Sequence, residues 1–175
     1  MNKQQKIRQI AGIAVLSALT IILTIVSNYI IIGGISINLS LIPIVLAAII
    51  FGPYAGFFVG LINGGFVMLS AQAFFAVSPI GTVIVCLLKT SVAGLLAGYL
   101  YKWLSGKNEI ISTFATALIV PIVNTSLFII GSLIFFQGVF GELISILVSV
   151  NFLIEVAINI MLAPAIIRII KIVKK

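Results

Sequence analysis

Long apolar segments separated by short polar breaks make up almost the whole sequence. The segments lie at residues 10–32, 37–51, 54–69, 80–103, 110–136 and 143–170. Four of the six exceed the length of about 20 residues that a helix needs to span a bilayer core. The second and third are shorter, and either cross the membrane at a tilt or form a re-entrant pair. The pattern predicts an all-α fold: one membrane domain over residues 1–175, built as a compact bundle of six transmembrane helices.

Composition agrees with lipid as the main solvent. Of the 175 residues, 62% are hydrophobic and 7% are charged, and the mean hydropathy is +1.39. Soluble domains carry roughly 25% charged residues, so this chain lacks the polar side chains to cover a water-facing surface. A single cysteine, Cys86, and the absence of histidine exclude an internal disulfide and a Cys- or His-based metal site. We therefore expect no metal and no cofactor.

The N-terminus is basic, through Lys3, Lys6 and Arg8, and then apolar, as in a secretory signal peptide. The apolar stretch over 10–32 is longer than the roughly 7–15 residues of a signal core, and no small-residue cleavage site ends it. We therefore expect a retained membrane helix.

The distribution of charge predicts the orientation in the membrane. Except for Lys89, the basic residues cluster near the two chain ends and near the break that follows 80–103. The breaks at 33–36, 70–79 and 137–142 contain no Lys or Arg. The positive-inside rule then places both termini in the cytoplasm of a multi-pass cell-membrane protein. The net charge of +7 fits this topology and contact with anionic lipid, whereas nucleic-acid binding would need a soluble basic surface with stacking aromatics.

Small residues recur at helical spacing in two places. After Gly52-Pro53, which predicts a tight turn, Gly56, Gly60 and Gly64 lie on one helical face. Such a face allows close backbone approach, which drives helix association in lipid. We expect an intramolecular packing ridge.

Alanines in the first segment form the second stripe, with Ala11, Ala14 and Ala18 on one face near the cytoplasmic end. Their spacing allows either packing inside the bundle or docking of another membrane protein.

Two ionisable residues, Lys89 and Glu155, are predicted to lie inside the bilayer. A charge there costs about 2.5–3.5 kcal/mol on insertion scales, so each marks a candidate functional site. Glu155 shares one helical face with Asn151 and Asn159, at spacings of four residues. Lys89 favours a solute with a carboxylate or another anionic group.

Further amides are predicted near this layer. Asn63 and Asn124 fall near the middle of their segments, and Gln72 and Ser78 lie in the outer break that follows the third segment. Either Lys89 neutralises Glu155 and the asparagines tie helices together, or these residues line a pocket for a small polar solute. Polar groups from four segments at similar depth favour the pocket.

An enzyme is not expected. Besides Glu155 the chain has two acids, Glu109 and Glu142, which are predicted at opposite membrane faces and cannot act as a pair. No nucleophile–base pair can be identified from spacing, and no phosphate-binding GxxxxGK[ST] loop is present.

The stretch INLSLIPIVLAAIIFGPYAGFFVGLI, residues 37–62, resembles the second-to-third-helix signature of the substrate-binding S components of energy-coupling factor (ECF) transporters. Length, six hydrophobic segments, basic ends and the alanine stripe are similar as well. The resemblance implies a subunit of a prokaryotic cell membrane that captures a vitamin or related micronutrient. It implies as partners a transmembrane coupling protein and two ATP-binding-cassette (ABC) ATPases.

Carried over by position, the resemblance makes the alanine stripe, with Ala14 and Ala18, the docking surface for the coupling protein. It places the pocket in the outer half under the loops at 33–36 and 70–79, with Phe74 and Phe75 in a lid. A second hypothesis, of another class, is a self-sufficient secondary carrier or channel. It would couple flux to ions through Glu155 and would dimerise along the glycine ridge.

Overall fold

The computed structural model describes residues 3–29, 31–32, 35–36, 38–106, 108–137 and 151–173. Within these residues the chain forms seven helices and one pair of two-residue strands. The helices are α1 (Lys3–Tyr29), α2 (Leu41–Ile50), α3 (Pro53–Ser70), α4 (Gln72–Val77), α5 (Pro79–Leu104), α6 (Glu109–Phe135) and α8 (Phe152–Val173). The strands β1 (Ile31–Ile32) and β2 (Ile35–Ser36) pair antiparallel.

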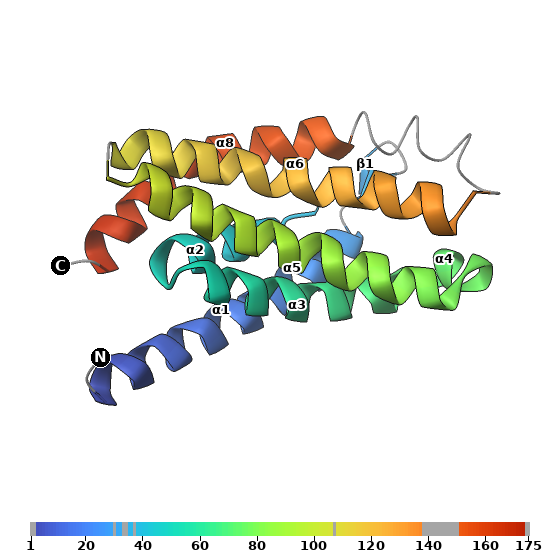
Figure 1. Ribbon diagram of the computed structural model, residues 1–175, viewed down its shortest axis with the longest axis horizontal. Helices are drawn as coiled ribbons and strands as arrows, with labels where there is room; N and C mark the ends of the chain where they lie inside the picture. The colour runs from blue at the N-terminus through green and yellow to red at the C-terminus, as the bar shows by residue number, and fades with distance from the viewer. Residues whose placement is uncertain are drawn as a thin grey trace.

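The long helices extend roughly along the longest axis of the molecule (Figure 1). The two chain ends lie at one end of this bundle, and α4 lies at the other (Figure 1). Five of the described helices, α1, α3, α5, α6 and α8, are long and apolar enough to cross a membrane. The predicted all-α membrane architecture is confirmed, and the cytoplasmic location of the termini stays a prediction.

The second predicted span, at 37–51, is a short helix. α2 covers ten residues and rises about 15 Å, half of the roughly 30 Å of a bilayer core. The backbone before it is held outside the helix, because the Leu39 N–H donates to Ser27 Oγ at 3.0 Å. The chain leaves the helix at Gly52, whose φ of 95° turns it into Pro53 at the start of α3. The tight Gly-Pro turn is confirmed, whereas the count of six full spans is not.

Other boundaries differ from the prediction. α1 begins at Lys3 and ends at Tyr29 instead of covering 10–32, since polar residues can continue a helix beyond the lipid. The stretch 70–79, expected to be a loop, contains α4, because its central QAFFAV sequence carries no helix breaker. Residues 138–150, with the start of the last predicted span and most of the loop at 137–142, lie outside the described residues.

The ten-residue apolar helix α2 forms the centre of the bundle. Most residues of α2 are buried, and Leu41, Ile44 and Val45 are fully enclosed. α2 contacts α1, α3, α5, α6 and α8. A helix that is apolar on every side can be enclosed on every side by other helices, and α2 has five of them as neighbours.

The glycine ridge packs against α5 of the same chain, as predicted. A Cβ at Gly56 would overlap the carbonyl oxygen of Gly94, and one at Gly60 would overlap that of Thr90. Gly64 meets the backbone of Cys86 in the same way. Because α5 occupies this face, the ridge is not available for the dimer contact that the carrier hypothesis requires.

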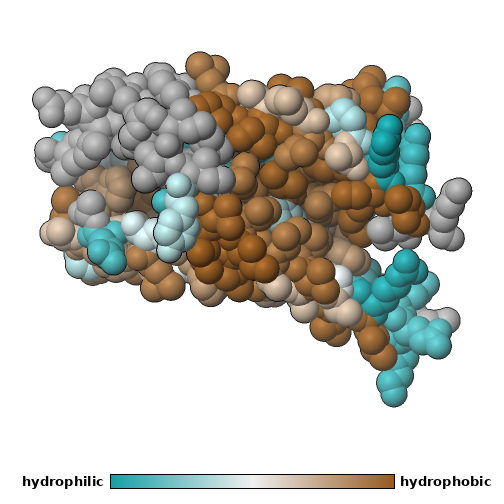
Figure 2. All heavy atoms as spheres, turned by 180° about the vertical axis from the view of Figure 1, so that it is seen from behind, coloured by the Kyte–Doolittle hydropathy of each residue, from teal (hydrophilic) through white to brown (hydrophobic). Residues whose placement is uncertain are grey.

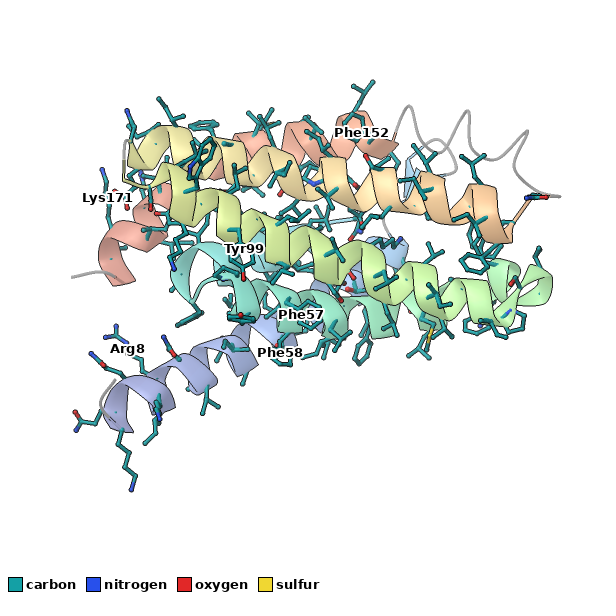
Figure 3. All side chains as sticks on the ribbon, in the orientation of Figure 1. Arg8, Phe57, Phe58, Tyr99, Phe152 and Lys171 are labelled. Atoms are coloured by element: carbon teal, nitrogen blue, oxygen red, sulfur yellow. The ribbon has the colours of Figure 1, made fainter. Side chains whose placement is uncertain are left out.

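The outer surface suits lipid across its middle. Figure 2 shows a broad apolar zone there, with hydrophilic side chains gathered at the end that carries the termini. Figure 3 places Arg8 and Lys171 at this end, and exposed Lys102 closes α5. Lys107, Lys174 and Lys175 lie outside the described residues.

Candidate functional site

A cavity of about 210 Å³ lies inside the bundle, toward the end away from the termini. Six of the described helices contribute side chains to it: the C-terminal parts of α1 and α3, the short α4, the middle of α5 and α6, and the first turn of α8. Figure 3 shows Phe152, one of its lining residues, on α8 and well away from Lys171 at the terminal end. The described lining residues are Thr24, Ser27, Asn28, Asn38, Val67, Ser70, Phe74, Lys89, Asn124, Thr125, Phe128, Asn151, Phe152 and Glu155.

The structure brings five of the predicted site residues to this one cavity. Lys89 comes from α5, Asn124 from α6, Glu155 from α8 and Phe74 from α4, with Asn151 just before α8. These positions are far apart in the sequence. α6 packs antiparallel to both α5 and α8 and so brings the residues of these three helices together.

The carboxyl group of Glu155 is the most enclosed charged group of the site, with the residue only 2% exposed. Its Oε1 accepts a hydrogen bond of 3.3 Å from Asn151 Nδ2, and the Asn124 side chain lies beside the same carboxyl group. Its Oε2 has no hydrogen-bond partner among the described residues. A carboxylate with free acceptor capacity inside a bundle can bind a donor group of a solute.

The ammonium group of Lys89 lies over an aromatic ring. Its Nζ lies 5.0 Å from the ring centroid of Phe128, within the range of a cation–π contact. Phe74 meets Phe128 edge to face, with centroids 5.8 Å apart, and meets Phe136 at 5.1 Å. The ammonium group therefore keeps donors for a bound molecule, and the three rings form an apolar wall beside it.

The other predicted residues lie outside the lining. Asn63 Oδ1 is 2.8 Å from Thr24 Oγ1, which ties α3 to α1. Asn159 Nδ2 donates to the Glu155 carbonyl oxygen at 2.8 Å, within α8. Ser78 caps α5, because its Oγ accepts from the Gly81 N–H at 3.2 Å. Exposed Gln72 and half-buried Phe75 belong to α4.

Sequence reasoning missed the hydroxyl and amide groups that α1 supplies. Thr24 and Ser27 line the cavity, and Asn28 Nδ2 donates to Ser70 Oγ at 2.7 Å, which ties the ends of α1 and α3. A signal exists, since Ser17, Thr20, Thr24 and Ser27 recur at three- and four-residue spacing and all are buried. This hydroxyl stripe identifies the face of α1 that turns into the bundle.

The alanine stripe lies on a different face of α1. Ala11, Ala14 and Ala18 are all exposed, so they do not take part in packing inside the described bundle. Their small side chains leave a shallow surface toward the end of α1 that carries the N-terminus.

Metal ligands are not grouped in the described part of the chain: no three Cys, His, Asp or Glu residues there could hold a metal ion together.

The chain is similar to a known protein family over most of its length. A family model described as "ECF transporter, substrate-specific component" matches residues 8–167. No curated protein and no solved structure matches the chain. The matched range runs from the first turns of α1 almost to the end of α8 and includes every residue that lines the cavity.

Proposed function

Because the chain belongs to the family of ECF transporter substrate-specific components, we propose that it captures a small polar solute in the cavity between its helices. The observation that carries the proposal is the presence of opposite charges, Lys89 and Glu155, on one cavity of an apolar bundle. Charged groups inside a membrane are costly and mark binding or transport sites. A subunit of this kind binds its solute, so no enzymatic activity is expected on this chain.

The lining supports a compact solute such as a vitamin or related micronutrient. Aromatic walls at Phe74, Phe128 and Phe152 suit a ring or another apolar part. Lys89 then binds an acidic or other acceptor group of the solute. A cavity with mostly apolar walls and a few convergent polar groups is typical of small-molecule sites.

Capture takes place from the outer side of a prokaryotic cell membrane. The cavity lies away from the basic end of the bundle, which the positive-inside rule assigns to the cytoplasm. Phe74 on α4 contacts the ring of Phe128 beside the cavity, and with Phe75 this short helix forms part of the cover.

Uptake depends on partners. The exposed stripe of Ala11, Ala14 and Ala18 is the proposed docking surface for a transmembrane coupling protein, which works with two ABC-type ATPases. ATP is hydrolysed on those partners, and lipid surrounds the rest of the bundle. Small side chains at this position allow the close helix approach that membrane association requires.

Native mass spectrometry tests the capture function, using protein purified in mild detergent from cells grown in rich medium. We expect a bound small molecule in the wild-type protein and its loss from the Lys89→Met variant. Lys102→Met, at the exposed end of α5, is the matched control and should retain the molecule. An empty protein that moves solutes alone in liposomes would overturn the proposal in favour of a self-sufficient carrier.

A further inference from the structure

Three oxygen atoms around the buried carboxyl group have no hydrogen-bond partner among the described residues. They are Oε2 of Glu155, Oδ1 of Asn124 and Oδ1 of Asn151, and we refer to them as the acceptor corner. All three residues line the cavity. Glu155 and Asn124 are 2% and 5% exposed, so the protein encloses these groups almost completely.

The carboxyl group orients the amide of Asn151. Nδ2 of Asn151 donates to it at 3.3 Å, and the Asn124 side chain lies beside it. A carboxylate can only accept hydrogen bonds, so Asn151 turns its NH₂ group toward Glu155 and directs its oxygen elsewhere. The corner therefore presents three acceptor oxygens without partners, although each amide NH₂ group also carries a second N–H.

The donors of the cavity come from another helix. Lys89 on α5 carries three N–H donors, and the contact found for its Nζ is with the face of Phe128. The acceptor corner is built by α6, α8 and the residue before α8. The cavity thus combines a donor group from α5 with unpaired acceptors from the neighbouring helices, and aromatic rings line the space as well.

We infer that the solute presents a planar group rich in N–H donors, of the amidine or amino-heterocycle type, to the acceptor corner and an acceptor group to Lys89. This inference rests on the proposed function and narrows it to one solute class. Buried acceptors without partners are unfavourable until a donor reaches them, and an N–H donor with positive charge is the strongest partner for a carboxylate. A divalent metal cation fits less well, because Ca²⁺ and Mg²⁺ take about six or more oxygen ligands and the acceptor corner offers three.

Two probes of nearly the same shape and opposite polarity test the inference: benzamidinium, with N–H donors, and benzoate, with acceptors only. Fragments of this size bind weakly, so each is added at about 10 mM to solute-depleted protein in sodium-free detergent buffer. We expect benzamidinium to raise the midpoint of thermal unfolding more than benzoate does. Glu155→Gln should lower the affinity for benzamidinium at least about 10-fold. Glu109→Gln, at the far end of α6, is the matched control and should change neither response.

Asn151→Leu is a second variant that keeps the carboxyl group, and it should weaken benzamidinium binding less than Glu155→Gln does. A preference for benzoate, no response to either probe, or an equal stabilisation by sodium ions alone would each overturn the inference.

The solute released from the wild-type protein separates this inference from the proposed function. Its mass shift in D₂O counts its exchangeable hydrogens, and at least two on nitrogen are expected. A bound solute that lacks N–H groups would overturn the inference and leave the capture function intact. A protein that holds no solute and responds to neither probe would overturn both.

Discussion

The hydroxyl group of Thr90 on α5 donates a hydrogen bond of 2.7 Å to the carbonyl oxygen of Gly60 on α3. The two backbones come this close because Gly60 has no side chain, and a Cβ there would overlap the Thr90 carbonyl oxygen. Lys89 precedes Thr90 in the sequence, so this contact also holds the backbone from which the Lys89 side chain reaches the cavity. Helix packing and the binding site are therefore linked through adjacent residues.

Replacing Gly60 with alanine should separate α3 from α5. Because the new Cβ meets backbone rather than a movable side chain, we expect the free energy of unfolding to fall by about 1–3 kcal/mol. Gly65→Ala on the same helix is the matched control, since a Cβ there has no atom within 4 Å. Thermal unfolding in detergent measures both, and equal effects would contradict the packing argument.

The sequence predicts the long helices well because lipid imposes a simple rule on them. The segments at 54–69, 80–103 and 110–136 agree with α3, α5 and α6 to within one residue at each end. Every spanning residue must suit lipid or a neighbouring helix, so the apolar runs mark the spans. The short α2 does not follow from this rule, because its length is set by the turn at Gly52 and by a tertiary contact to Leu39.

Side chains that line the cavity are predictable only where they are costly in lipid. Lys89, Glu155 and the amides stand out for this reason. Thr24 and Ser27 do not, because hydroxyl groups in a helix can bond the carbonyl four residues earlier, and both do so here. Such residues occur on lipid-facing and buried faces alike, and the tertiary fold decides which of them meet a cavity.

The contact between Thr24 and Asn63 should stabilise the folded protein. Thr24→Val keeps the shape of the side chain but leaves the buried Asn63 Oδ1 without this partner, which should cost about 1–3 kcal/mol. Thr20→Val is the matched control, because the bond found for the Thr20 hydroxyl is to Leu16 within α1. Chemical unfolding of both variants measures the difference. Equal losses would show that the link between α1 and α3 contributes nothing.

The ring of Phe128 should affect binding through Lys89. Phe128→Leu keeps an apolar side chain but removes the π face under the ammonium group, a contact worth about 0.5–2 kcal/mol. We expect the dissociation constant of the solute identified by mass spectrometry to rise accordingly, as measured by isothermal titration calorimetry. Phe57→Leu is the control, because Phe57 pairs with Phe58 on α3, outside the cavity lining. A change of the same size in both variants would argue for a general loss of packing.

Altering the alanine stripe should prevent docking of the coupling protein and leave solute capture unchanged. Ala14 and Ala18 are exposed on α1, whereas the cavity takes residues from Thr24 onward on the same helix. Ala14→Trp and Ala18→Trp should therefore leave solute binding unchanged, because the large ring projects away from the bundle. Uptake by cells that also produce the coupling protein and the ATPases should fall to background, since a tryptophan prevents close helix approach.

The matched control for docking is Ala165→Trp, which adds the same ring at an exposed position on α8 and should allow uptake. Co-purification with the coupling protein provides the direct measurement: it should be lost in the α1 variants and kept in the α8 variant. If instead the α1 variants assemble normally but no longer hold solute, the stripe contributes to the shape of the cavity and docking takes place on another surface. Because binding and assembly are measured separately on the same purified proteins, the two roles of α1 can be assigned to its two faces.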